Sequence, residues 1–359
     1  MILIIACNYL MLESQDKFVD RMKYLDRKCT GVTLILNGDF RQEMITELSP
    51  DVICFAYIDR MRDDALFEQV FGLNNGRVPI CLMAIDLFHV RTIVAPSKTF
   101  HKLDAIIAPI KHERILNEYR QIRPDMKVYN LSSRFVDITV FKERRLEKKY
   151  DILYYGNNFF ELSTNSNVVD DEYYRGSIRP HKDNFYPFRK RLYDLFSSSS
   201  DRFRVKILKP RTTHNATIRN VELSQLLNQS WLAIATCSRS DYLMDKYLEI
   251  AASGCGIIGN CPSDYRDLFE DKIVEVTPNM SDDEILTHVE LALSDKSRLQ
   301  RRIDSLSYTI TSRHNYTVMT GEFLSIMNQL STKQLSCNFS FIPRSEEHTS
   351  ELQSPDHLV

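Results

Sequence analysis

The sequence predicts an α/β protein built from two successive doubly wound parallel sheets. Short apolar runs alternate with helix-like segments through the first half of the chain, a charged stretch over residues 136–151 interrupts the pattern, and the alternation then restarts. A chain of 359 residues is also long enough for two domains. We therefore expect two Rossmann-like domains facing a cleft, over residues 1–145 and 146–332, with the last helix a candidate to pack back on the first domain, and a tail over 333–359.

In the first half, each strand is an apolar run too short for a helix. Helix-like segments separate these runs, and Pro50 ends one of them. The predicted strands are 1–7, 31–37, 51–58, 78–86 and 103–109, and the predicted helices are the polar stretch ending at Arg27, 41–50, 63–73 and 111–122.

The second half repeats this pattern after a polar insert over residues 160–186. Pro187 occupies the first turn of a helix, where proline is well tolerated, and Ser281 with Glu284 forms a capping-box signature. The predicted strands are 151–157, 202–208, 231–237, 254–260 and 272–278, and the predicted helices are 187–198, 221–230, the segment before Gly254, 281–295, 296–314 and 316–330.

Composition narrows the class of protein. The net charge of −2 gives no electrostatic reason to expect nucleic acid or an anionic membrane as the main partner. No apolar run approaches the roughly 20 residues that span a bilayer, and the eight cysteines form no C-x-x-C pair. We expect a cytoplasmic protein with no transmembrane segment, no metal site and no nucleic-acid partner.

The stretch "DYLMDKYLEIAASGCGIIG", residues 241–259, concentrates chemistry in a chain with only 10 glycines. It follows a buried strand, and ligands of open α/β sheets lie beyond the carboxyl ends of strands. We expect Ser240 or Asp241 to cap a helix whose amino end receives phosphate oxygens, and Gly254 to end that helix.

Lys246 and Glu249 lie on one face of this helix, together with Tyr242. The lysine suits a diphosphate, and the two carboxylate oxygens of Glu249 match the two O–H groups of a vicinal diol. The alternative is an exposed ion pair at i, i+3, which would contribute only ~0.2–0.5 kcal/mol.

The stretch resembles the donor-site motif of GT-B glycosyltransferases. In the retaining branch a Glu is followed, after seven intervening residues, by a second Glu, and here Asp241 and Glu249 take these places. "LEIAASGCGIIG" is similar to the helix and strand that follow, and "DKYLEIAASG" resembles the spore-maturation-type branch. The resemblance implies transfer of a sugar from a nucleoside diphosphate donor to an unknown glycan, lipid or protein acceptor held by the first domain, with retention of anomeric configuration and no metal or further cofactor. It also implies that helix dipole, Lys or Arg stabilises the leaving diphosphate.

Most of the other candidate residues lie at the carboxyl ends of predicted strands. Gly156 and Asn157 suit phosphate or sugar contacts, although a plain turn is the alternative. Arg189 in the first turn of its helix is a candidate for the diphosphate, or else part of a solvated basic face. In the first domain, Asp86 and His89 are candidates to bind or deprotonate an acceptor hydroxyl, although a lone histidine is more often structural.

Two other functions remain open. A nucleotide-sugar epimerase of the same fold is one. A non-catalytic GT-B protein is the other, supported by Asp241 in place of the first Glu and by the lack of glycine after the first strand. Residues 344–359, "RSEEHTSELQSPDHLV", resemble a translated sequencing adapter and are left out of the fold prediction.

Overall fold

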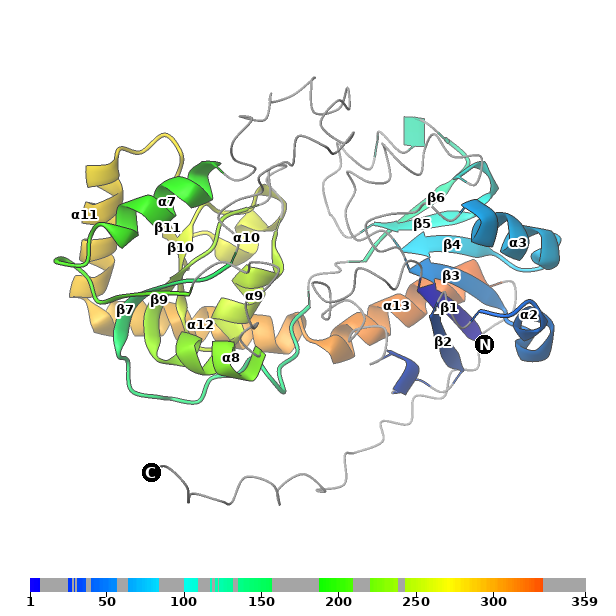
Figure 1. Cartoon of the computed structure of the whole chain (residues 1–359), viewed down its shortest axis with the longest axis horizontal. Coiled ribbons are helices and arrows are strands. Elements are labelled where there is room, and N and C mark those ends of the chain that lie inside the picture. Colours follow the sequence, from blue (N-terminus) through cyan, green and yellow to red (C-terminus); the bar gives the residue numbers. More distant parts are fainter. Residues whose placement is uncertain are drawn as a thin grey trace, which may run out of the picture.

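A computed structural model shows two parallel β-sheets flanked by helices, arranged as two lobes along the long axis of the molecule (Figure 1). The predicted fold class is confirmed. The structure describes residues 1–6, 25–27, 29, 31–36, 40–56, 64–83, 100–108, 117, 120, 121, 123–131, 135–156, 187–208, 220–237 and 243–331.

The first sheet has the strand order β2-β1-β3-β4-β5-β6, and every pair is parallel. Its first five strands form where the sequence has apolar runs, because a parallel sheet covered on both faces needs apolar side chains on both. The sixth, at the edge, is more polar. The strands are β1 (Ile2–Ala6), β2 (Val32–Leu36), β3 (Val52–Ala56), β4 (Ile80–Met83), β5 (Ala105–Ala108) and β6 (Lys127–Asn130).

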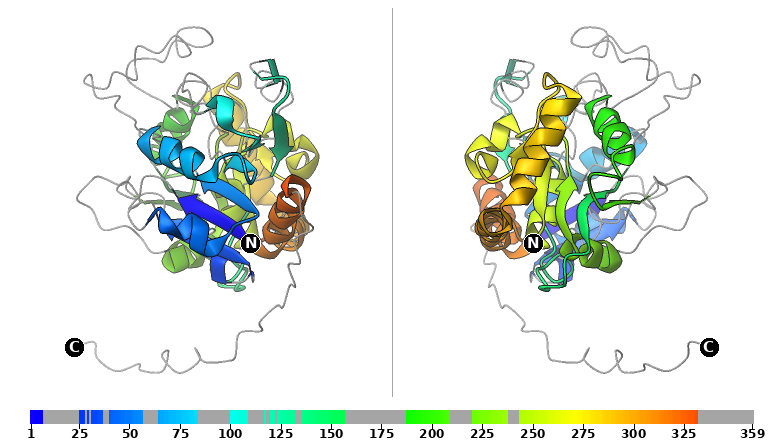
Figure 2. Two further views of the ribbon diagram at one scale, coloured as in Figure 1. Left: turned by 90° about the vertical axis from the view of Figure 1, so that its right-hand side faces the viewer. Right: turned by 90° about the vertical axis from the view of Figure 1, so that its left-hand side faces the viewer.

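Helices cover both faces of this sheet. On one face α3 (Asp64–Asn74) places Phe67 against Phe55, with ring centroids 4.0 Å apart, and α2 (Glu43–Leu48) adds partly buried side chains to the same core. On the other face lies the last helix of the described chain, α13 (Tyr316–Leu330), whose Phe323 and Met327 are fully buried in one cluster with the strands. In Figure 2 this helix runs beside the strands of the first sheet.

The chain passes between the lobes at two places that touch one another. Val136 forms a parallel bridge with Asn315, and the Val136 N–H donates to the His314 carbonyl at 2.8 Å. The His314 ring contacts Phe135 on one side and Tyr265 on the other. The two passages are therefore joined by backbone and ring contacts.

The second sheet has the order β11-β10-β9-β7-β8, again parallel throughout. Its strands are β7 (Tyr150–Tyr154), β8 (Val205–Ile207), β9 (Ser230–Ile234), β10 (Gly256–Gly259) and β11 (Val274–Glu275). Its helices are α7 (Pro187–Ser197), α8 (Asn220–Asn228), α9 (Asp245–Ala252), α10 (Arg266–Phe269), α11 (Asp282–Ser294) and α12 (Lys296–Arg313). A 3-10 turn, η6 (Ser263–Tyr265), precedes α10, and another, η4 (Phe100–Lys102), precedes β5 of the first sheet.

Two predicted helix starts are confirmed in detail. Pro187 is the first residue of α7. Ser281 caps α11 in a full capping box, because its hydroxyl accepts from the Glu284 N–H while the Glu284 carboxylate accepts from the Ser281 N–H. Both are local signals that need no tertiary contact.

Across the described ranges, none of the helices combines the length and the apolar character that crossing a bilayer requires.

Candidate functional site

The helix that carries Lys246 and Glu249 begins later than the sequence predicts. Its N-cap is Met244, with no side-chain cap bond, so the predicted cap at Ser240 or Asp241 is wrong. The chain stays extended through Met244, and the Leu243 N–H donates to the Asp264 carboxylate at 3.2 Å. This anchor holds the backbone out of the helical conformation until Asp245. Ser240, Asp241 and Tyr242 themselves lie outside the described residues.

The other end of α9 is built as predicted. Gly254 adopts φ +65°, the left-handed region that glycine enters without strain. Its N–H donates to the Ala251 carbonyl at 3.1 Å, and the Cys255 N–H donates to the Ile250 carbonyl at 3.2 Å. These two bonds form a Schellman motif, which stops the helix and turns the chain directly into β10.

Glu249 is buried, with 3% of its surface exposed. The Tyr155 hydroxyl donates to its Oε2 at 3.4 Å, and Tyr155 directly follows β7. An exposed surface ion pair is therefore not the role of this carboxylate. A carboxylate costs several kcal/mol to bury unless it is paired or hydrogen-bonded, and the Tyr155 hydroxyl supplies one such bond to Glu249. A buried, fixed carboxylate next to the end of β7 is a candidate ligand-binding group.

The side chain of Lys246, from α9, reaches the carboxyl end of β7. Its Nζ donates to the Tyr155 carbonyl and lies 4.3 Å from the centroid of the Tyr155 ring, a cation–π distance. Gly156 is next in the chain at φ +101°, and a Cβ there would lie 2.8 Å from the lysine nitrogen. Three predicted residues, Gly156, Lys246 and Glu249, are thus brought together around Tyr155.

Tyr155 is one of two residues of the site that sequence reasoning missed, and Thr236 is the other. Burial raises its pKa well above the ordinary value for a phenol, the charge of Glu249 raises it further, and Arg189 opposes the shift. The side chain therefore stays neutral and able to donate its hydrogen bond. Its one sequence signal is its place directly before Gly156 at the end of a predicted strand, and nothing there shows that its hydroxyl meets a glutamate 94 residues away.

Arg189 approaches from α7 to the neighbouring strand. It is 6% exposed, and its Nε donates to the Thr236 hydroxyl at 3.0 Å. Thr236 lies two residues beyond β9, which pairs with β7. Arg189 is therefore not part of a solvated basic face. Burial raises the pKa of Tyr154 and of Tyr247, and the charge of Arg189 lowers both values by a smaller amount.

The remaining predicted residues fall outside the part of the chain that the structure describes. These are Asp86, His89 and Asn157, along with the three residues before Leu243. Within the described ranges, His, Cys, Asp and Glu side chains do not gather in threes in a way that suits a metal ion. The described part of the site thus consists of two cationic side chains and a buried carboxylate at the carboxyl ends of β7 and β9. Such a set suits an anionic ligand that also carries hydroxyl groups.

Comparison with known proteins identifies a shared fold. No family model matches the chain, and no curated protein is similar to it in sequence. A sucrose-phosphate synthase from Thermosynechococcus elongatus aligns with a TM-score of 0.57 over 92% of this chain and 99% of its own, at 10% identity. A glycosyltransferase from Rickettsia africae ESF-5 gives 0.56 over 92% and 98%, at 12% identity.

HepE from Anabaena, in complex with UDP and glucose, gives a TM-score of 0.52 over 92% of this chain and 100% of its own, at 12% identity. All three align along nearly the whole length of both lobes. At 10–12% identity this similarity is one of fold and does not transfer an activity. The chain has the two-domain GT-B fold that these glycosyltransferases share.

Proposed function

We propose that the protein transfers a glycosyl group from a nucleoside diphosphate sugar to an acceptor. The observation that carries this proposal is the convergence of Lys246, Arg189 and buried Glu249 beyond two adjacent strands of the second sheet. The carboxyl edge of an open α/β sheet is the usual place for a nucleotide. The Anabaena protein of the same fold in complex with UDP-glucose supports the donor class.

In the proposed reaction the two cations act on the leaving group. As the bond between the anomeric carbon and the diphosphate breaks, negative charge grows on the departing oxygen. Lys246 and Arg189 are held in place by the Tyr155 carbonyl and the Thr236 hydroxyl before the substrate arrives. Charges fixed in advance stabilise the transition state without reorganisation, which is usually the largest catalytic term.

Glu249 is the proposed partner of the donor's hydroxyl groups. Tyr155 donates to one of its oxygens and so fixes the carboxylate. We assign Tyr155 a positioning role, because it acts on the donor through Glu249. Replacing Tyr155 with Phe should raise the KM for the donor several-fold and leave kcat within about twofold, since one hydrogen bond contributes ~1 kcal/mol.

The finer assignments belong to the same proposal. Asp241 takes the first acid position toward the sugar, with Ser240 and Tyr242 beside the diphosphate and Gly156 and Asn157 at the strand end. Asp86 and His89 of the first lobe contact the acceptor hydroxyl. The anomeric configuration is retained and no metal takes part. NMR of the product anomer, with and without EDTA, tests the last two points, and an inverted product would reject retention.

The direct test is turnover with a panel of UDP-, GDP- and dTDP-sugars, measured by release of the nucleoside diphosphate. Wild type should turn over at least one donor, and Glu249→Gln should lose about 10²–10³-fold in kcat/KM. Lys149→Ala is a matched control for Lys246→Ala, because Lys149 is exposed just before the opposite end of β7. Binding of a nucleotide with no turnover of any donor would overturn the proposal, and an epimerised donor would replace it with epimerisation.

A further inference from the structure

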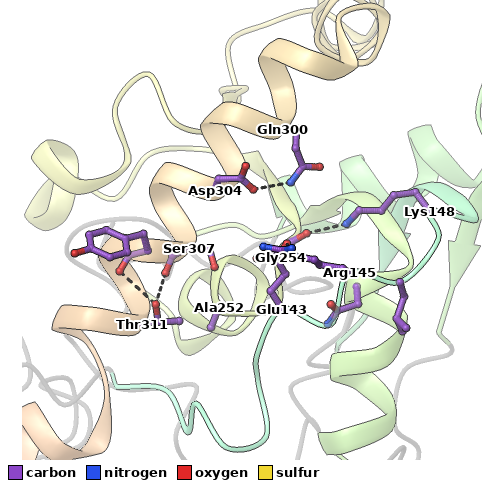
Figure 3. Close-up of a pocket in the computed structure, with 12 residues that line it drawn as sticks. Glu143, Arg145, Lys148, Ala252, Gly254, Gln300, Asp304, Ser307 and Thr311 are labelled. Atoms are coloured by element: carbon purple, nitrogen blue, oxygen red, sulfur yellow. Dashed lines mark hydrogen bonds and ion pairs between the residues drawn. The ribbon is translucent and has the colours of Figure 1, made fainter.

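A groove of about 700 Å³ lies at the opposite end of the second lobe from the candidate donor site. Four parts of the chain form it: the passage before β7, the end of α8, the end of α9 with the turn after it, and one face of α12 (Figure 3). Lys148 precedes β7 and Gly254 precedes β10, so the groove is at the amino ends of these strands. The side chains of its walls come chiefly from Glu143, Arg145, Gln300, Asp304, Tyr308 and Thr311.

One wall of the groove is held rigidly. Asn228 of α8 accepts from the Arg144 N–H, and its amide nitrogen donates to the Lys142 carbonyl at 2.9 Å. Arg144 also donates to the Ser224 hydroxyl at 2.6 Å. These bonds fix the chain on both sides of Glu143, so the wall is pre-organised and a ligand would not have to order it.

Charge in the groove is balanced. Glu143 and Asp304 supply two carboxylates, and Arg145 and Lys148 supply two cations. Lys148 already donates to the carbonyls of Ser230 and Gly254, at 2.9 and 2.7 Å. The sum favours neither an anion nor a cation. Because the side chains that form the walls are mostly polar, the groove also lacks the apolar floor that binds lipids or drug-like molecules.

The polar groups suit a ligand that both donates and accepts hydrogen bonds. Gln300 Nε2 donates to Asp304 Oδ1 at 2.7 Å, which orients the carboxylate (Figure 3). The Arg145 Nε and the Glu143 Oε1 lie 3.9 Å apart, so these two groups form only a weak ion pair with each other. Arg145 is 89% exposed at the rim, held at φ 51° in the left-handed region.

Tyr308 adds an aromatic surface. It is 76% exposed, the most exposed of the large hydrophobic residues that the structure describes. An exposed ring with an apolar body and a polar tip packs against the C–H face of a sugar ring and leaves the hydroxyls to neighbouring polar groups. Tyr308 lies one turn from Asp304 on α12, so ring and carboxylate share one face of the helix.

We propose that this groove is a binding site for a neutral oligosaccharide, separate from the donor site. Asp304 accepts hydrogen bonds from sugar hydroxyls, Tyr308 stacks on a sugar ring, and Arg145 donates at the rim. The inference does not depend on catalysis, since none of Lys246, Glu249 and Arg189 lines the groove.

Fluorescence of the single tryptophan gives a direct readout. Lys148 lines the groove, and its Nζ lies 5.7 Å from the centroid of the Trp231 ring. Titration with maltohexaose, cellohexaose and N-acetylchitohexaose should give saturable binding of at least one sugar, with a Kd on the order of 1 mM. Asp304→Ala and Tyr308→Ala should each weaken that binding about tenfold.

The controls keep the two sites apart. Asp201→Ala and Leu291→Ala remove an exposed carboxylate and an exposed apolar side chain outside the groove and should leave sugar binding unchanged. UDP binding should be unchanged in Asp304→Ala, and sugar binding unchanged in Glu249→Gln. The inference is overturned if none of the sugars binds at about 10 mM, if the two groove variants bind like wild type, or if Glu249→Gln abolishes sugar binding.

Discussion

The two lobes differ in what they bury. Among the described residues of the first lobe's strands and flanking helices α2 and α3, the only buried polar side chain is Asn74, which bonds back to Val78. The second lobe buries Arg189, Glu249 and Thr236 beyond its strands. Burying a charged group is costly, so these groups do not serve packing alone. Under the proposed function, the described part of the first lobe therefore serves as a scaffold, and the described part of the site lies in the second lobe.

The largest expected effect is a loss of stability in the first lobe that leaves the candidate donor site of the second lobe intact. Phe67→Ala removes a fully buried ring stacked on Phe55 and should lower the free energy of unfolding of the first lobe by about 3–5 kcal/mol. Urea unfolding followed by circular dichroism measures this loss. UDP affinity of the folded protein should stay within about twofold. A large loss of UDP affinity at urea concentrations where the variant is still folded would mean that the first lobe also contributes to UDP binding.

Glu249→Gln tests the opposite half of the comparison. It keeps the size of the side chain and an acceptor for Tyr155, yet removes the charge. Donor turnover should fall about 10²–10³-fold, or about 2.7–4 kcal/mol, while stability changes little. Glu47→Gln is the matched control, since Glu47 is an exposed acid of α2 in the first lobe. Equal activities of the two variants would assign Glu249 to packing.

Arg189→Met sharpens the comparison within the second lobe. Loss of a charge-assisted bond to the diphosphate should raise the Kd for UDP about 10–150-fold, or about 1.5–3 kcal/mol. Arg189→Lys keeps the charge without the fork of donors and should lose less. Arg298→Met removes an exposed arginine of α12 as a control. Calorimetric titration measures all three, and a methionine variant that binds UDP like wild type would remove Arg189 from the site.

The smallest effect concerns a helix end that the sequence predicts unaided. Ser281→Ala removes the side-chain acceptor of the α11 capping box and should destabilise the second lobe by about 1 kcal/mol, seen as a lower Tm. Turnover should be unchanged. The pKa of Glu284 is lowered by its bonds to Ser281, so the stability it contributes is present above the ordinary glutamate pKa and lost as pH falls through the lowered value. A Tm difference between wild type and Ser281→Ala that does not shrink in acid would contradict this account.

The first lobe also shows where sequence reasoning stops. Its five apolar strands were predictable because burial on both faces requires continuous apolar runs. The sixth, β6 (Lys127–Asn130), was not, because it lies at an edge with Lys127 and Asn130 exposed. The sequence predicts a linker after this strand. In the structure, Val136 of that segment forms a parallel bridge with Asn315, a contact that no local sequence pattern encodes.

The site was half predictable for a related reason. Helical spacing places Lys246 and Glu249 on one face of α9, and strand ends place Gly156 nearby. The start of α9 was misplaced because the anchor that delays it, Asp264, lies 21 residues ahead. Tyr155 and Thr236 were missed because their partners come from distant helices, and only the folded sheet sets these contacts.

The most direct test of the central claim is the affinity of UDP for Lys246→Ala beside that for Lys149→Ala. The claim is that a nucleoside diphosphate rests where β7 ends, against the Lys246 ammonium. Calorimetric titration should show the Lys149 variant binding like wild type and the Lys246 variant binding at least about tenfold more weakly, with both still folded and unfolding cooperatively on heating without ligand. Equal UDP affinity in the two variants would contradict the placement of the donor at this end of the second sheet.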